Sequence, residues 1–261
     1  MADPVVELSA EAISQWVGSY LWPFFRIGSF FMIIPIISTQ LVPMRVRLGL
    51  ALLMTLLVAP LLDEVPAVDA LSPEAVVITL QQILIGLAMG FAVFMLFQLF
   101  VVAGQMVAMQ MGLGFASMVD PSNGVNVPVL SQFYLNAVTL MYLAMNGHLV
   151  AFEVFIESFY TIPIAADGLA ISSLWELVNR MSWLFASAML LALPAMAAVL
   201  LVYISFGVMT RAAPQMNIFA IGFPIALLFG LFANWVLFRD LFPHFQRLSE
   251  ETFIFLREMQ Q

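Results

Sequence analysis

The sequence lacks cysteine and lysine, and it holds few charged residues of any kind. Without cysteine the chain forms neither a disulfide nor a thiolate metal site. For the same reason, cysteine usage does not indicate whether the protein works in a reducing or an oxidising compartment. Charged residues make up 9% of the chain and hydrophobic residues 63%, whereas about a quarter of an ordinary soluble domain is charged. This composition excludes a lone soluble domain, a disordered chain, a disulfide scaffold and a nucleic-acid-binding protein. It predicts an integral membrane protein, or a subunit buried in a hydrophobic assembly.

Long runs without charge predict that the hydrophobic residues form helices. These runs cover residues 12–44 (apart from Arg26), 48–62, 75–119, 121–152, 181–210 and 212–238. A membrane-spanning helix needs about 20 apolar residues, so about five or six crossings fit. The run 75–119 is too long for one crossing, because a helix over residues 75–111 would be about 55 Å long against a bilayer core of about 30 Å. We expect a kink, a hairpin or a projecting helix there.

Two of the predicted helices carry a face that does not suit lipid. In the first helix this face is an arc about 100° wide at helical pitch, made of Gln15, Gly18, Ser19, Arg26 and Ser29. In the third it is a narrower stripe made of Thr79, Gln82, Gly86, Gly90 and Gly104. The GxxxG spacing of Gly86 and Gly90 lets two backbones approach closely. Two interpretations stay open: packing within this chain, or packing against other subunits.

The distribution of arginine only partly predicts how the chain is oriented in a membrane. All eight basic residues are arginine, against sixteen acidic residues. The positive-inside rule places the connections that hold Arg45, Arg47 and Arg211 in the cytoplasm and the N-terminus outside. Six crossings would then leave outside a C-terminal tail that holds Arg239, Arg247 and Arg257. Either one segment does not cross, or the chain is not a conventional bundle.

Residues 105–128 (QMVAMQMGLGFASMVDPSNGVNVP) combine helix-breaking and apolar residues between two hydrophobic runs. Glycine and proline at this density break helices, and Asp-Pro followed by Ser-Asn-Gly is typical of a turn. Non-helical backbone at membrane depth is tolerated only where it is buried in protein or lines an aqueous cavity. The segment also holds four methionines, which adapt to irregular partners and suit a seal that admits unrelated polypeptides. The alternatives are an ordinary cytoplasmic loop and methionine as core filler.

Five stretches together resemble the FliR family of flagellar export-apparatus proteins, whose relatives serve in type III secretion by injectisomes. They follow the same order along nearly the whole chain and cover residues 42–50, 81–86, 110–121, 146–148 and 211–224. The stretch at Asn146-Gly147-His148 also predicts an interruption between two helices.

This resemblance implies an all-α fold of hydrophobic helical hairpins with broken or kinked helices, forming a membrane-associated subunit of a multi-subunit export gate. Residues 1–171, with a pore loop at 105–128, are expected to resemble FliP. Residues 172–261, a helical hairpin and a C-terminal tail, are expected to resemble FliQ. The implied partners are FliP, FliQ, FlhB-like subunits and unfolded flagellar proteins in transit, with no nucleic acid and no cofactor. The implied location is the bacterial inner membrane at the flagellar basal body, with the gate projecting to the periplasmic side.

The resemblance also assigns two sets of site residues. The loop that helps plug the closed pore comprises Met111, Gly112, Gly114, Phe115, Met118, Asp120, Pro121 and Asn126. Residues expected in helix or subunit packing are Arg26, Gln82, Gly86, Gly90, Gly104, Arg211, Pro214 and Gln215. No metal site is expected.

Two other classes of protein compete with an export gate: an intramembrane hydrolase and a secondary transporter. An intramembrane hydrolase would need a metal motif, a paired-aspartate site or a Ser/His pair, and neither His148 nor His244 has an evident partner, so we expect no enzyme. A polytopic secondary transporter for a small solute is the alternative, because residues 112–128 and 211–224 resemble discontinuous helices in corresponding halves. Ionisable residues for coupling are nearly missing from the hydrophobic runs, with Arg26 the main exception.

Overall fold

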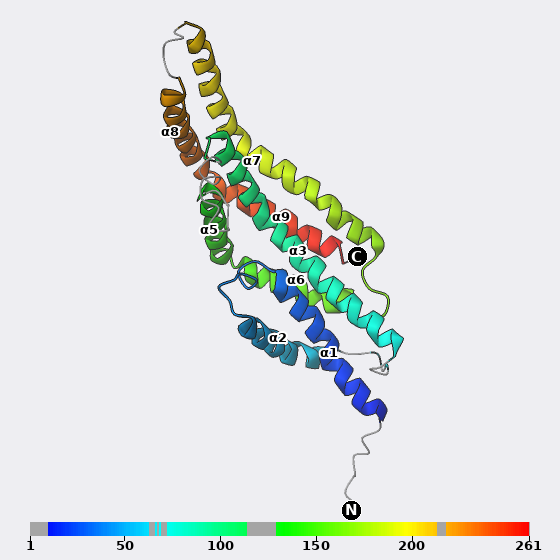
Figure 1. Cartoon of the computed structure of the whole chain (residues 1–261). Coiled ribbons are helices and arrows are strands. Elements are labelled where there is room, and N and C mark those ends of the chain that lie inside the picture. Colours follow the sequence, from blue (N-terminus) through cyan, green and yellow to red (C-terminus); the bar gives the residue numbers. More distant parts are fainter. Residues whose placement is uncertain are drawn as a thin grey trace, which may run out of the picture. The chain divides into compact units, whose positions relative to one another are not determined.

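The computed structural model describes residues 10–62, 66, 68, 72–113, 129–212 and 218–260 (Figure 1). Within these ranges every regular element is a helix, as the sequence predicted. The elements are α1 (Ala10–Ile33), α2 (Met44–Val58), the short 3₁₀ helix η1 (Ala59–Leu61), α3 (Pro73–Gln110), α5 (Val129–Ala144), α6 (Gly147–Thr161), α7 (Ile171–Ala212), α8 (Ile218–Phe238) and α9 (Leu241–Glu258).

Four helical stretches are long and apolar enough to cross a membrane. They are Met44–Leu61, Pro73–Gln110, Ile171–Arg211 and Ile221–Phe238, and the broken pair α5 and α6 makes a possible fifth. The long run of the third helix is one continuous helix of 38 residues, which at 1.5 Å per residue exceeds a bilayer core of about 30 Å. A hairpin therefore does not form within residues 73–110, whereas a kink or a projection beyond the bilayer stays a prediction. The predicted interruption also forms, because Asn146 has a φ of 56° between α5 and α6.

The chain forms two compact units, and each unit is assembled from separated stretches of sequence. The first unit comprises Met1–Phe94, His148–Val178 and Thr252–Gln261, and the second comprises Met95–Gly147 and Asn179–Glu251. Helices α3, α7 and α9 therefore contribute residues to both units. The expected division at residue 171 concerns likeness to other export proteins, and it stays a prediction.

The first unit has a completely buried arginine at its centre. Arg26 of α1 is 0% exposed, and its Nε donates a hydrogen bond to Gln82 Oε1 of α3 at 2.7 Å. Its two Nη atoms donate to the carbonyl oxygens of Ser158 and Ile162, each at 2.9 Å. These carbonyls lie at the C-terminal end of α6, where the helix dipole favours a cation, and the guanidinium also lies 4.3 Å from the ring centroid of Phe159. Arg26 thus joins three helices through neutral partners.

The GxxxG pair of α3 contacts α1 of the same chain. A Cβ at Gly86 would overlap Ser29 Oγ and the carbonyl oxygen of Arg26, and a Cβ at Gly90 would lie 3.1 Å from the carbonyl oxygen of Phe30. The two helices therefore meet backbone to backbone, which only a residue without a side chain permits. This close approach places Gln82, one turn earlier on α3, within reach of Arg26.

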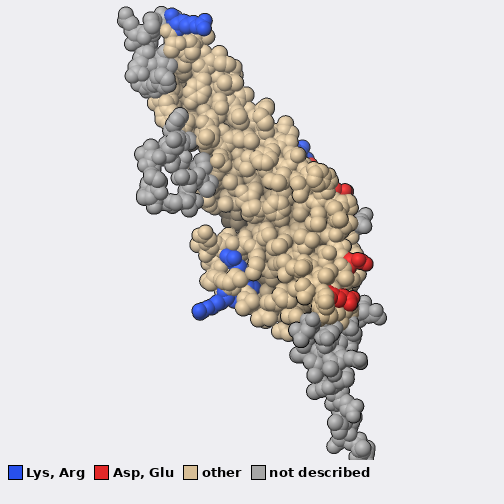
Figure 2. Space-filling model, turned by 45° about the vertical axis from the view of Figure 1, so that its right-hand side comes forward, with Lys and Arg blue, Asp and Glu red and all other residues tan. Residues whose placement is uncertain are grey.

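The outer surface carries many large apolar side chains and few charges. Figure 2 shows a face that is mostly uncharged, with a few scattered basic and acidic groups. Of the four candidate spans, the most apolar stretch of α3 is 67% buried, whereas those of α2, α7 and α8 are only 22%, 28% and 22% buried. These three helices need cover from lipid or from other proteins, because exposed apolar patches of this extent are rare on soluble monomers.

Replacing Arg26 with methionine should destabilise the first unit. The substitution removes the charge but leaves Gln82 Oε1 and two carbonyl oxygens buried with fewer donors, so we expect a loss of about 3 kcal/mol or more. Thermal unfolding of the detergent-solubilised chain, followed by circular dichroism, measures the effect. Arg239→Met is the matched control, because Arg239 is exposed and its replacement should leave the melting temperature unchanged. Equal melting temperatures for the two variants would contradict a central role for Arg26.

Adding a single methyl group at Gly86 should separate α1 from α3. Gly86→Ala places a Cβ against a backbone carbonyl that cannot rotate away, so we expect a cost of about 1–3 kcal/mol and poor recovery of any assembled complex. Gly49→Ala is the control, because a Cβ there meets nothing within 4 Å. The yield of folded chain after size-exclusion chromatography tests this, and equal yields would show that the close approach is dispensable.

Candidate functional site

Helix α3 ends in a turn that requires glycine. Leu113 N donates to the carbonyl oxygen of Ala108 at 2.9 Å, and Gly112 N donates to that of Met109 at 3.0 Å. This pair of bonds is a Schellman motif, whose left-handed residue is here Gly112 with a φ of +81°. Gly112 therefore supplies the tight backbone that the sequence suggested, immediately before residues 114–128.

Two residues at this turn are seated against α8. Met111 is completely buried, and its side chain lies so close to Gly230 that a Cβ there would overlap it. A Cβ at Gly112 would lie 2.9 Å from the ring of Phe223. The end of α3 is thus held by α8 as well as by its own cap.

Residues 114–128 are followed directly by α5, whose first turns pack against α3 and α8. Gly104 of α3 lies against the backbone of Ser131, and a Cβ at Gly104 would come within 2.9 Å of its Cα. Tyr134 donates its hydroxyl hydrogen to Asn234 Oδ1 of α8 at 2.7 Å, and both residues are buried. The first turns of α5 are therefore tied to both α3 and α8.

Both ends of the segment open on one apolar recess. The recess has a volume of about 350 Å³ and is lined by Leu113, Val129, Leu130, Phe133, Leu231, Asn234, Trp235 and Phe238. Since Leu113 precedes residues 114–128 and Val129 follows them, the segment leaves from and returns to the same place. The residues that bracket 114–128 therefore belong to one packed set of helix ends from α3, α5 and α8, which we call the loop base.

Methionines flank this base. Met106, Met109 and Met196 line a recess of about 470 Å³ together with Gln105 and Gln110, and Met109 is 60% exposed. Flexible thioether side chains on an accessible surface can adapt to partners of different shape.

Several of the expected site residues lie outside the described ranges. They are Gly114, Phe115, Met118, Asp120, Pro121 and Asn126, which lie between α3 and α5 in sequence, and Pro214 and Gln215, which lie between α7 and α8. Arg211 lies exposed in the last turn of α7, where a cation complements the helix dipole. In the described part of the chain, no three His, Cys, Asp or Glu residues are grouped as metal ligands.

Three residues that hold the loop base were not expected from the sequence. They are Tyr134, Gly230 and Asn234. Asn234 carried a usable signal, because it is the one strongly polar residue within α8, and a buried amide in an apolar helix requires a partner. The signal for Gly230 was weaker, since its contact depends on where Met111 lies.

The comparisons with known proteins agree over nearly the full length. The chain is 34% identical to flagellar biosynthetic protein FliR of Escherichia coli (strain K12) over 257 residues, which cover 98% of this chain and 97% of that protein. It is 26% identical to flagellar biosynthetic protein FliR of Bacillus subtilis (strain 168) over 212 residues, 80% of this chain and 82% of that one. It is 26% identical to surface presentation of antigens protein SpaR of Shigella flexneri over 217 residues, 82% of each chain.

A family model described as "Bacterial export proteins, family 1" matches residues 17–252. The match includes the Arg26 network, the close approach at Gly86 and the whole base of the loop. The chain therefore belongs to family 1 of the bacterial export proteins.

Proposed function

We propose that this chain is a subunit of the flagellar type III protein export gate and that residues 112–126 help to close its channel. The observation that carries the proposal is the loop base, where a glycine cap, a seated methionine and a buried Tyr134–Asn234 hydrogen bond fix both ends of the segment. A plug must block a pore at one position and yield to passing chains, which a short loop on a rigid base can do. The likeness to FliR proteins supports the flagellar assignment, because the E. coli FliR is 34% identical and the SpaR protein 26%.

The chain acts in this proposal with FliP, FliQ and FlhB-like subunits. Support comes from the exposed apolar surfaces of α2, α7 and α8, which a single chain leaves uncovered. Residues 1–171 take the place of a FliP-like subunit and residues 172–261 that of a FliQ-like subunit, so that one chain completes a helical assembly. Arg211, Pro214 and Gln215 lie in the connection that meets FliQ and FlhB.

The assembled gate lies at the inner membrane and projects to the periplasmic side in this proposal. Helices buried against other subunits need not obey rules for lipid contact, which accounts for the conflict between the arginine distribution and six crossings. Unfolded flagellar proteins pass through the channel, and the chain itself performs no catalysis. The proton-motive force and a separate ATPase supply the energy.

The contacts of Arg26 argue against a secondary transporter. A coupled transporter needs an ionisable group that exchanges protons, ions or partners at an accessible site. Arg26 is the main ionisable residue of the hydrophobic runs, but it is fully buried and bonded to four neutral acceptors. It is a structural cation that no solute reaches.

Removing the plug segment should make the gate leak. Deleting residues 115–126 while keeping the Gly112 cap should raise the ion conductance of membranes that hold the assembled gate. The deletion removes the side chains that close the channel but retains the loop base. Planar-bilayer recordings of the purified complex measure this. An unchanged conductance, with normal recovery of the complex, would contradict the proposed plug.

A point substitution tests the base separately. Gly112→Val forces a β-branched residue into a left-handed conformation, at about 1–2 kcal/mol, and drives its side chain into Phe223. We expect a smaller leak than the deletion causes. Gly207→Val is the matched control, since a Cβ at Gly207 meets nothing within 4 Å, and it should keep the gate closed.

A further inference from the structure

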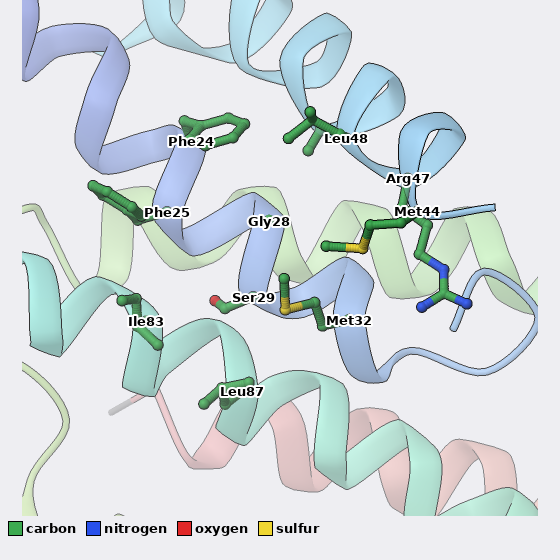
Figure 3. Close-up of a pocket in the computed structure, with 11 residues that line it drawn as sticks. Phe24, Phe25, Gly28, Ser29, Met32, Met44, Arg47, Leu48, Ile83 and Leu87 are labelled. Atoms are coloured by element: carbon green, nitrogen blue, oxygen red, sulfur yellow. The ribbon is translucent and has the colours of Figure 1, made fainter. Parts of the chain in front are cut away.

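A second apolar recess lies in the first unit, away from the loop. It has a volume of about 400 Å³, within the range of ligand pockets, which is about 300–1,000 Å³. Figure 3 shows it between α1, α2 and the first half of α3. Its apolar walls include Phe24, Phe25, Met32, Leu48, Ile83 and Leu87.

The walls offer almost no hydrogen-bonding group to a ligand. Ser29 lines the recess, but its hydroxyl already donates to the carbonyl oxygen of Arg26 at 2.9 Å. Arg47 is the other polar side chain of the lining. A ligand that fills the recess must therefore be apolar along its length and polar, if anywhere, at the end near Arg47.

Arg47 has spare hydrogen-bonding capacity. One Nη donates to the carbonyl oxygen of Thr39, whereas its Nε is shielded from solvent and has no hydrogen-bond partner among the described residues. Arg45, two residues earlier, is exposed. Within the described part of the chain, no carboxylate forms an ion pair with either arginine.

The local backbone adds to this positive potential. Arg45 and Arg47 lie in the first turn of α2, which has no acidic residue and no side-chain cap. The N-terminal end of a helix carries partial positive charge. One end of the apolar recess therefore attracts an anion, and the recess itself attracts a hydrocarbon chain.

We propose that this recess binds an anionic phospholipid, with one acyl chain between α1, α2 and α3 and the phosphate against Arg47 and Arg45. The recess is open toward the outer side of α2, because two of its lining residues, Met44 and Leu48, are 57% and 48% exposed. The neighbouring leucines Leu53 and Leu57 are 60% and 68% exposed, as expected for a surface that meets lipid. Basic pockets between helices are typical sites for anionic lipid headgroups.

Charge selectivity is the first test. The assembled complex that contains this chain is purified in neutral detergent, and dioleoylphosphatidylglycerol or dioleoylphosphatidylcholine is titrated in under native mass spectrometry. The two lipids have the same acyl chains, so we expect tighter retention of the glycerol lipid. The double variant R45A/R47A should bind it roughly 25-fold more weakly, since each arginine near an anionic surface contributes about fivefold. R239A/R247A removes the same charge elsewhere and should bind as the wild type does.

Blocking the recess is the second test. A Cβ at Gly28 meets nothing within 4 Å and Gly28 lines the recess, so Gly28→Leu should fill it, keep the fold and abolish retention of both lipids. Gly49→Leu is the matched control, because Gly49 also has open space but is not part of the lining. Unchanged helicity and melting temperature establish that both variants fold.

Three results would overturn the proposal. They are equal retention of the two lipids by the wild type, wild-type binding by R45A/R47A, and retention of phosphatidylglycerol by the Gly28→Leu variant. If the Gly28→Leu chain does not assemble but retains phosphatidylglycerol as the unassembled wild-type chain does, this third result means that a helix of a partner subunit fills the recess and the lipid site is wrong. None of these results depends on whether residues 112–126 close the channel.

Discussion

The structure of the first unit depends on one cation that is paired with carbonyl oxygens in place of a carboxylate. Arg26 joins α1, α3 and α6, and each acceptor is available only because another feature places it. Gln82 is in reach because Gly86 lets α1 and α3 meet. The Ile162 carbonyl lies just beyond the end of α6, and the Ser158 carbonyl in the last turn accepts from Arg26 in addition to Ile162 N. Taking a charge out of water costs several kcal/mol unless it is well bonded, so this geometry allows little variation. A single buried residue thereby connects three helices of the first unit.

The sequence was sufficient for the helical fold and for part of the candidate site. Charge-free runs and glycine spacing predicted the helices, the break at Asn146 and the turn at Gly112, because each depends on local backbone preferences. The hydrogen-bond partners of Arg26 and the Tyr134–Asn234 hydrogen bond could not be predicted from the sequence, because they join residues 56 to 136 positions apart. Polar and small residues marked the faces of α1 and α3 that meet inside the chain, whereas the more uniformly apolar α8 gave almost no such signal.

Hydrophobicity has two different roles in this molecule. The apolar side chains of α3 are mostly buried within the chain, whereas those of α2, α7 and α8 mostly face outward. The loop base also depends on few polar groups. The buried hydrogen bond between the Tyr134 hydroxyl and the Asn234 amide connects α5 to α8, and few other polar groups nearby compete for it. In the proposed gate, the outward faces meet other subunits and lipid.

The central claim is that this loop lies on the path of the exported polypeptide. Because the chain has no cysteine, Phe115→Cys introduces a unique thiol, and an export substrate with one cysteine can be stalled in the channel. Oxidation followed by non-reducing electrophoresis then reports contact. The account predicts a disulfide between substrate and Cys at position 115, and none when the cysteine replaces the outward-facing Leu57. The same weak crosslinking at both positions would contradict it.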